Sequence, residues 1–349
     1  MKWLSEEELI HWIAAGGEDA PAFLRRGIGD DCAVCRPAPG TELVVTTDLL
    51  VENRHFRLTT SPLADLGWKV GAANLSDIAA MGARPVAFFL AAAFPPDRQA
   101  EFKAIMGGLR AILQWAAAPL AGGDLSAADR FLFCATVIGE APAGGALLRS
   151  GARPGDIVYI TGEPGHSAAG LRLLEAGWRV GARGGVRDAA GAPVPPQAPA
   201  RRCLTRHLRP EPRLAAGLFL RESGAVTACI DTSDGIAKDL RQIAVMSGVG
   251  TEIDAVFVRA CADGALVTVA DALGGGEDYE LLFTVDPSRE ATFLNAYTRA
   301  AGLPPLRRVG CIVADHPGEL RLLTPAGPQP LPVSGFDHFR PPRSHEPRA

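Results

Sequence analysis

The chain contains 349 residues, of which 47% are hydrophobic and 21% charged, and this composition predicts two globular domains rather than a disordered chain. The net charge of −4 excludes the strongly basic surface typical of proteins that bind nucleic acid or anionic membranes. The longest strongly apolar run, residues 86–94, is too short to cross a bilayer, and residues 1–8 lack the pattern of a signal peptide. Seven scattered cysteines favour a reducing compartment, so we expect a cytoplasmic protein.

The first half of the chain mixes helices and strands. Residues 2–15 have the spacing of an amphipathic helix with Ser5 as its N-cap, and a Gly/Asp loop follows at 27–31. Strands are predicted at 42–51, 88–93 and 130–139, and helices at 65–81 and 98–117. Long helices between strands indicate an α/β or α+β layer.

A Gly/Pro cluster at 148–156 marks a boundary between two domains, which we place at 1–148 and 149–340, with a disordered tail at 341–349. The run 181–200, rich in Gly, Ala and Pro, is expected to be a mobile surface insertion. Strands are predicted at 157–161 and 225–230, on both sides of 274–280, and helices at 167–176, 202–208, after Pro212, and at 236–247.

Acidic residues recur in short Gly, Ser or Thr contexts at the ends of these elements. They are Asp30 and Asp31, Asp48, Asp77, Asp124, Asp231 and Asp234, and Glu277 and Asp278. Any one of them has an ordinary explanation as a turn or a helix cap. Asp77 fits that explanation least, because it continues an apolar helix stripe that includes Val70 and Ala73. A carboxylate there needs a metal ion or a buried ion pair, and both remain open.

Asp48 follows the apolar-rich segment 43–47, where a strand would deliver it to the rim of a sheet, and Asp231 follows the predicted strand 225–230. Asp234 opens a predicted helix, and strand ends and helix starts are the places where open sheets bind ligands. Carboxylates from several elements, with hydroxyls beside them, suit a hard cation such as Mg²⁺. The sequence has no P-loop lysine motif. The nearest candidate, residues 162–167, is either a phosphate cradle or an ordinary turn with Ser167 as N-cap.

Two other features have both a structural and a functional interpretation. Cys32 and Cys35 form a lone C-x-x-C pair, which fits two ordinary thiols better than zinc or redox chemistry. His55 is either an exposed histidine or a ligand contact. His166 and His207 have no special context in the sequence.

The motifs become recognisable when they are taken together and in order. They are Gly27-Ile28-Gly29-Asp30-Asp31, Thr46-Thr47-Asp48, His55-Phe56, Asn74-Leu75-Ser76-Asp77, Gly122-Gly123-Asp124, Arg149-Ser150-Gly151, His207-Leu208-Arg209-Pro210, Asp231-Thr232-Ser233-Asp234-Gly235, Gly275-Gly276-Glu277-Asp278-Tyr279-Glu280 and Gly335-Phe336-Asp337. From about residue 5 to about residue 339, this series resembles the bacterial thiamine-monophosphate kinases.

The resemblance implies the two-domain fold shared with aminoimidazole-ribonucleotide synthetase and selenophosphate synthetase. In that fold an N-terminal domain pairs with its copy in a homodimer through its sheet, and the C-terminal domain is α/β. The resemblance also implies ATP-dependent, Mg²⁺-dependent phosphorylation of thiamine monophosphate to thiamine diphosphate by direct in-line transfer, the last step of thiamine diphosphate biosynthesis.

Roles carried over from the family follow the matching motifs. Mg²⁺ ligands would be Asp31, Thr46, Thr47, Asp48, Asp77, Asp124, Asp231 and Asp234; nucleotide contacts would be Gly123, Asp124, Arg149 and Ser233; and thiamine phosphate contacts would be His55, Glu277 and Phe336. No side chain is expected to act as a general base, because the attacking group is already a phosphate. Phe336 has an alternative role as a plain core aromatic.

The sequence departs from the family pattern at a few positions. Leu125 replaces the usual Thr after Gly-Gly-Asp, Asn53-Arg54 replaces a smaller pair that contains Gly, and Thr232 replaces an aliphatic residue. Two other functions stay open: a synthetase of the same fold that activates another substrate with ATP, and a nucleotide- or metal-binding protein without catalysis.

Overall fold

The structure is a computed structural model that describes residues 4–15, 22–29, 31–262, 266–333 and 335. The contacts within the chain divide it into two compact units. The first contains residues 1–147, 179–187 and 208–224, and the second contains 148–178, 188–207 and 225–349. The predicted disordered tail at 341–349 lies outside the described residues. No helix in the described part of the chain is both long and apolar enough to span a membrane.

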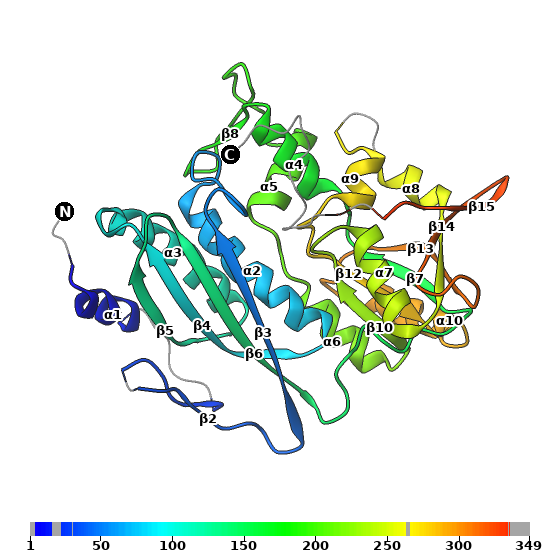
Figure 1. The fold of residues 1–349 in the computed structure, drawn as a ribbon, viewed down its shortest axis with the longest axis horizontal. Coiled ribbons are helices and arrows are strands. Elements are labelled where there is room, and N and C mark those ends of the chain that lie inside the picture. The colour runs from blue at the N-terminus through cyan, green and yellow to red at the C-terminus, as the bar shows by residue number, and fades with distance from the viewer. Residues whose placement is uncertain (1–3, 16–21, 30, 263–265, 334, 336–349) are drawn as a thin grey trace. The chain divides into compact units, whose positions relative to one another are not determined.

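The first unit is built on a four-stranded sheet in the order β3-β6-β4-β5, in which only the β4–β5 pair is parallel (Figure 1). Its strands are β3 (Thr41–Val51), β4 (Arg84–Phe94), β5 (Leu120–Ala127) and β6 (Leu132–Pro142). Two separate two-stranded sheets are formed by β1 (Leu24–Arg26) and β2 (Val34–Cys35), and by β8 (Arg179–Val180) and β9 (Val186–Arg187). Its helices are α1 (Glu6–Ala14), α2 (Leu63–Ala80), η1 (Pro96–Arg98), α3 (Gln99–Trp115) and α6 (Leu214–Ser223).

Most elements predicted for this unit are confirmed. Ser5 caps α1 in a reciprocal capping box with Glu8. Strand β5 was not predicted, because Gly122-Gly123-Asp124 has the composition of a turn. A methyl group at Gly123 would lie 1.9 Å from the backbone oxygen of Leu90 in β4. The glycine is therefore there to let two strands approach closely, and not to make a turn.

Helices α2 and α3 pack so closely that their contact depends on glycine. A Cβ atom at Gly67 would lie 1.8 Å from the backbone oxygen of Ile105, and one at Gly108 would lie 1.7 Å from that of Ala64. This packing fixes the position of α2, which also contacts strands β3, β4 and β6. It therefore positions Asp77, near the C-terminal end of α2, against the sheet.

The segment at 209–210 is held in the first unit by a tryptophan clamp. The Trp68 indole N–H donates to the backbone oxygen of Pro210 at 2.6 Å, and the Arg209 guanidinium lies 4.0 Å from the centre of the Trp68 ring. Asp65 forms an ion pair with Arg209 at 3.3 Å. A cation over an indole and a partly buried ion pair together give this motif a structural role.

The second unit contains a seven-stranded mixed sheet in the order β10-β12-β7-β13-β11-β14-β15, in which only β11 and β14 pair in parallel. Its strands are β7 (Ile157–Thr161), β10 (Val226–Asp231), β11 (Gly250–Asp254), β12 (Leu281–Val285), β13 (Leu306–Val313), β14 (Leu320–Thr324) and β15 (Gly327–Pro330). Its helices are α4 (His166–Glu175), α5 (Pro199–Leu208), α7 (Ile236–Ser247), α8 (Ala255–Cys261), α9 (Val269–Gly274) and α10 (Glu290–Arg299).

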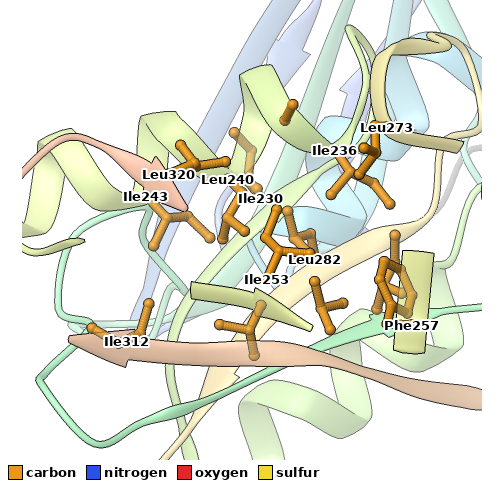
Figure 2. Packing of buried hydrophobic residues seen from close by; sticks show 14 of the residues in the cluster. Ile230, Ile236, Leu240, Ile243, Ile253, Phe257, Leu273, Leu282, Ile312 and Leu320 are labelled. Atoms are coloured by element: carbon orange, nitrogen blue, oxygen red, sulfur yellow. The ribbon is translucent and has the colours of Figure 1, made fainter. Parts of the chain in front are cut away.

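The core of the second unit lies between this sheet and helices α7, α8 and α9. Figure 2 shows Ile230 at the end of β10, Ile236 at the start of α7 and Leu282 of β12 packed in one buried cluster. The loop at 231–235 is thus anchored at both ends by core side chains. The prediction of a strand before residue 274 is wrong, because α9 occupies that segment, whereas the strand after 280 is confirmed as β12.

We expect Gly108→Ala to destabilise the protein by about 2–4 kcal/mol, because a methyl group there must push α2 away from α3. Chemical denaturation measures the effect. Gly107→Ala is the matched control, since the same substitution one residue earlier meets no atom within 4 Å. There we expect a gain of about 0.5–1 kcal/mol from helix propensity. Equal effects of the two variants would contradict the packing argument.

Candidate functional site

The candidate residues are divided between the two units. In the first unit, Thr46, Asp48 and Asp77 form a small polar cluster between β3 and α2. The Thr46 hydroxyl donates to Asp77 Oδ2 at 2.5 Å. Asp48 is exposed, but partial burial of its carboxyl and, second, the nearby charge of Asp77 together raise the pKa of that carboxyl to about 6. Two carboxylates that repel each other in this way favour a bound cation.

Thr47 lies on the opposite face of β3 from Thr46 and Asp48, because strand side chains alternate. Its hydroxyl donates to the backbone oxygen of Ala135 at 2.9 Å and lies 2.9 Å from the Thr136 hydroxyl. The structure therefore brings Thr46 and Asp48 together with Asp77 and leaves the Thr47 side chain apart from them.

A cavity of about 740 Å³ opens beside β5 in the first unit. Asp31, Gly123 and Asp124 line it, together with apolar side chains such as Phe89 and Met106. An apolar wall with a few acidic groups at the rim is typical of a small-molecule site. Cys32 and Cys35 also line this cavity, and both are free thiols.

His55 follows β3 in a tight turn and is half-buried. Its Nδ1 accepts a hydrogen bond from the backbone N–H of Val51 at 3.0 Å, which assigns the ring proton to Nε2. Asn53, in the same turn, has a φ of 65°, a conformation that Gly and Asn adopt readily. The replacement of a Gly-containing pair by Asn53-Arg54 therefore preserves the turn.

In the second unit, the loop at 231–235 packs directly against the loop at 274–280. A methyl group at Gly276 would lie 2.5 Å from the backbone oxygen of Ser233, and one at Gly235 would lie 2.8 Å from the backbone of Gly274. The backbone N–H of Glu277 donates to the oxygen of Ser233 at 2.8 Å. Ser233 and Glu277, both predicted ligand contacts, are thus neighbours through their backbones.

Thr232 connects the same two loops through its side chain. Its hydroxyl accepts from the backbone N–H of Glu280 at 3.0 Å, and it is 1% exposed. An aliphatic residue at this position would leave that buried N–H without this acceptor. The departure from the family pattern therefore adds a contact between the loops.

The two predicted metal ligands of this loop lie in different environments. Asp231 is buried as the last residue of β10, whereas Asp234 is half-buried and forms an ion pair with Lys238 at 2.6 Å. Arg149 is exposed. Phe336 lies outside the described residues, but Gly335 before it approaches the loop, because a Cβ there would lie 2.9 Å from the backbone oxygen of Asp234.

Two acidic residues that the sequence analysis gave no role support these loops. Asp239 accepts from the backbone N–H groups of Asp234 at 3.2 Å and Gly235 at 3.0 Å, while burial and the charge of Asp234 raise its pKa to about 7. Asp278 accepts from the N–H groups of Gly165 at 2.6 Å and Ser167 at 3.0 Å. The only sequence signals for these two roles are the positions of the residues. Asp239 lies one turn inside a predicted helix, and Asp278 lies next to Glu277.

The contacts of Asp278 decide between the two interpretations of residues 162–167. Its carboxylate occupies the N-terminal N–H groups of α4, where a phosphate would otherwise bind. The segment is therefore a turn and not a phosphate cradle. The predicted N-cap is wrong, since Gly165 and not Ser167 is the N-cap of α4.

The oxygen atoms near Asp77 in the first unit are suitable ligands for a hard cation. Thr46, Asp48 and Asp77 present oxygen atoms, and Oδ1 of Asn74, one turn before Asp77, is buried with no hydrogen-bond partner among the described residues. In the same part of the chain, no group of three or more His, Cys, Asp or Glu side chains is arranged to hold a metal ion by itself. A cation there would also take ligands from hydroxyls, water or substrate.

Comparison with known proteins identifies the family. The model of the AIR synthase related protein N-terminal domain matches residues 29–141, and that of the C-terminal domain matches residues 153–322. The thiamine-monophosphate kinase of Salmonella typhimurium is 38% identical over 322 residues, covering 90% of this chain and 92% of its own. The chain belongs to the thiamine-monophosphate kinase family.

Solved structures agree with this placement among the thiamine-monophosphate kinases. The enzyme from Stenotrophomonas maltophilia K279a is 34% identical, with a TM-score of 0.77 over 91% of this chain and 96% of its own. A structure of AaThiL complexed with AMPPCP and TMP is 25% identical, with a TM-score of 0.71 over 87% of this chain and 89% of its own. The expected two-domain fold of the AIR synthase type is confirmed.

Burial raises the pKa of Asp278 to about 7 from an ordinary 3.8, although its two N–H donors act in the opposite direction. The folded chain therefore binds an extra proton between about pH 4 and pH 7, so this carboxyl makes stability fall as the pH rises through that window. We expect the stability of the wild type relative to Asp278→Asn to decrease from pH 4 to pH 7 in chemical denaturation.

Asp286→Asn is the contrasting control. The hydroxyl and N–H of Ser288 hold the pKa of Asp286 below its ordinary value, so its contribution is present above pH 4 and is lost as the pH falls. The two variants should therefore differ from the wild type with opposite pH dependence. A pH-independent difference for Asp278→Asn would show that the Asp278 carboxyl is not perturbed.

Proposed function

We propose that this protein transfers the γ-phosphoryl group of ATP to thiamine monophosphate, which gives thiamine diphosphate and ADP. Family membership along nine-tenths of the chain is the observation that carries the proposal. The retention of the acidic motifs at 46–48, 77 and 231–234 supports it, because a protein that had lost catalysis would have no need to keep repelling carboxylates.

The acceptor is a phosphate oxygen, which is already anionic at neutral pH and needs no strong general base. The difficulty of the reaction lies in bringing two anionic phosphates into line. The first unit supplies the cavity lined by Gly123 and Asp124, which we assign to the nucleotide. We also assign Arg149 and Ser233 of the second unit to the nucleotide, where the guanidinium offsets phosphate charge.

We assign the roles of Mg²⁺ ligands to Asp31, Thr46, Thr47, Asp48, Asp77, Asp124, Asp231 and Asp234, with Thr47 limited to its backbone oxygen by the outward direction of its side chain. Bound Mg²⁺ supplies charge neutralisation and alignment of the phosphates. With four lysines in the whole chain, most of that neutralisation has to come from metal ions and arginine.

His55, Glu277 and Phe336 are assigned to thiamine monophosphate. The contact of Nδ1 with Val51 leaves the ring proton of His55 on Nε2, and an Nε2–H donor suits a phosphate oxygen. Glu277 is a partly exposed carboxylate, which suits the cationic thiazolium ring. We place the reaction in the cytoplasm, and the seven free cysteines are in keeping with a reducing compartment.

We expect the purified protein with ATP, Mg²⁺ and thiamine monophosphate to form thiamine diphosphate, measured by chromatography. Asp77→Asn should lower kcat more than about a hundredfold at every Mg²⁺ concentration, because the amide cannot neutralise a cation, while the melting temperature stays near that of the wild type. EDTA should abolish turnover, and added Mg²⁺ should restore it.

Asp97→Asn is the control, since Asp97 is an exposed carboxylate of η1 in the same unit. It should leave the rate unchanged. ATP turnover with a different acceptor and none with thiamine monophosphate would favour a synthetase of the same fold. Tight nucleotide binding without turnover would favour a non-catalytic protein. Near-normal rates for Asp77→Asn would overturn its assignment as a metal ligand.

We also propose that the protein is a homodimer that pairs through the four-stranded sheet of its first unit. Strand β3 is at the edge of this sheet, and its apolar side chains Leu43, Val45 and Leu49 are 44%, 60% and 51% exposed. Alternate positions of one strand share a face, so these three side chains form an apolar stripe. An exposed stripe of this kind is typical of a protein interface.

Light scattering at micromolar concentration should give the mass of a dimer, and Val45→Arg should shift the protein to a monomer, because a charge would be buried in the interface. Val256→Arg is a matched control, since Val256 is 61% exposed, about as much as Val45, but lies on α8 of the second unit. A monomeric wild type would contradict the proposed assembly.

A further inference from the structure

His207 is a buried histidine that none of the roles above uses. It is 6% exposed, near the C-terminal end of α5. Its Nδ1 lies 3.5 Å from Oε2 of Glu277 and 3.2 Å from the hydroxyl of Ser167. The three side chains come from three different elements, α5, the loop before β12 and α4, so only the folded chain brings them together.

The approach of α5 to α4 depends on Gly170. A methyl group at Gly170 would lie 2.2 Å from the backbone oxygen of Cys203 and 2.9 Å from Cβ of His207. Residues three or four apart share one face of a helix, which places Ser167 beside Gly170 and Cys203 beside His207. The glycine therefore brings the imidazole into hydrogen-bonding distance of Ser167.

The chemistry of the partners assigns the proton of the imidazole. A carboxylate can only accept hydrogen bonds, so a favourable contact with Glu277 requires the proton on Nδ1. The hydroxyl of Ser167 is able to accept from the same N–H group. In this tautomer His207 is a buried donor directed at the Glu277 carboxylate.

The backbone around Glu277 is held from both sides. Glu277 has a φ of 64°, and its N–H donates to Ser233. The next residue, Asp278, is bound to the N-terminus of α4 through Gly165 and Ser167. With the backbone restrained, the torsion angles of the Glu277 side chain decide where its carboxylate lies, and the contact with His207 restricts those angles.

We propose that His207 is a positioning residue, which holds the Glu277 carboxylate in the orientation that binds the cationic ring of thiamine monophosphate. This inference rests on the proposed function and adds a residue to its substrate site. The imidazole itself touches neither substrate. Its loss should therefore weaken binding of thiamine monophosphate and leave binding of ATP intact.

Steady-state kinetics of three variants test the role. His207→Ala should raise KM for thiamine monophosphate about tenfold, with kcat and KM for ATP within about twofold of the wild type. His207→Asn should restore most of the loss, because the Asn Nδ2 donates from nearly the position of the histidine Nδ1. His316→Asn is the matched control, since His316 is exposed and its φ of 58° suits Asn, and it should change nothing.

A double-mutant cycle separates positioning from general stability. In a Glu277→Ala background, His207→Ala should change KM for thiamine monophosphate by less than about twofold, because there is no carboxylate left to position. Equal effects of His207→Ala in both backgrounds would overturn the inference. So would a rise in both KM values together with a fall in melting temperature, which marks a purely structural residue.

A measurement on the wild type covers the case in which His207→Ala does not fold. Nitrogen NMR of labelled histidine should show His207 protonated on Nδ1, and Glu277→Ala should shift that signal. An Nε2–H tautomer would overturn the inference while the activity of the wild type stands. A wild type inactive toward thiamine monophosphate would overturn the proposed function, and this inference with it, before any variant is compared.

Discussion

Carboxylates that are held close to one another and partly removed from water are the physical constraint on which the candidate residues of both units depend. In the first unit burial and then the charge of Asp77 raise the pKa of Asp48, and in the second unit burial and then the charge of Asp234 raise that of Asp239. Such an arrangement costs stability in the absence of a cation, so the rest of each unit has to hold the acidic residues in place. The chain does so with hydroxyls and backbone N–H groups more than with lysine.

Glycine makes this arrangement possible in each unit. Gly67 and Gly108 allow α2 to pack tightly on α3, which sets the position of Asp77. Gly235 and Gly276 allow the loops that carry Ser233 and Glu277 to touch through their backbones. In each case another backbone occupies the place of a side chain, and Gly235 also has a φ of 111°, a conformation that by itself favours glycine.

Buried acids serve the second unit in a different way from the acids of the candidate metal site. Asp278 caps α4, and Asp239 caps the loop before α7, so each offsets part of its burial by accepting two backbone hydrogen bonds. These caps connect the helices to the loops that bear Ser233 and Glu277. The site and the core of the unit are therefore one continuous structure, as the packing of Ile230 and Ile236 around the 231–235 loop shows.

The sequence by itself determined the family, the two-domain fold and most of the elements, because these depend on local periodicity and on motifs in a fixed order. It also singled out Asp77, since a carboxylate on an apolar helix stripe is visible without a structure. Only the tertiary structure decided the roles of His207, Asp239 and Asp278, which contact residues from other segments or hold a loop's backbone. Strand β5 could not be predicted for the same physical reason, which is that it depends on a contact with another segment. Its glycines allow a close approach to β4, and the sequence of one strand alone does not give its distance from another.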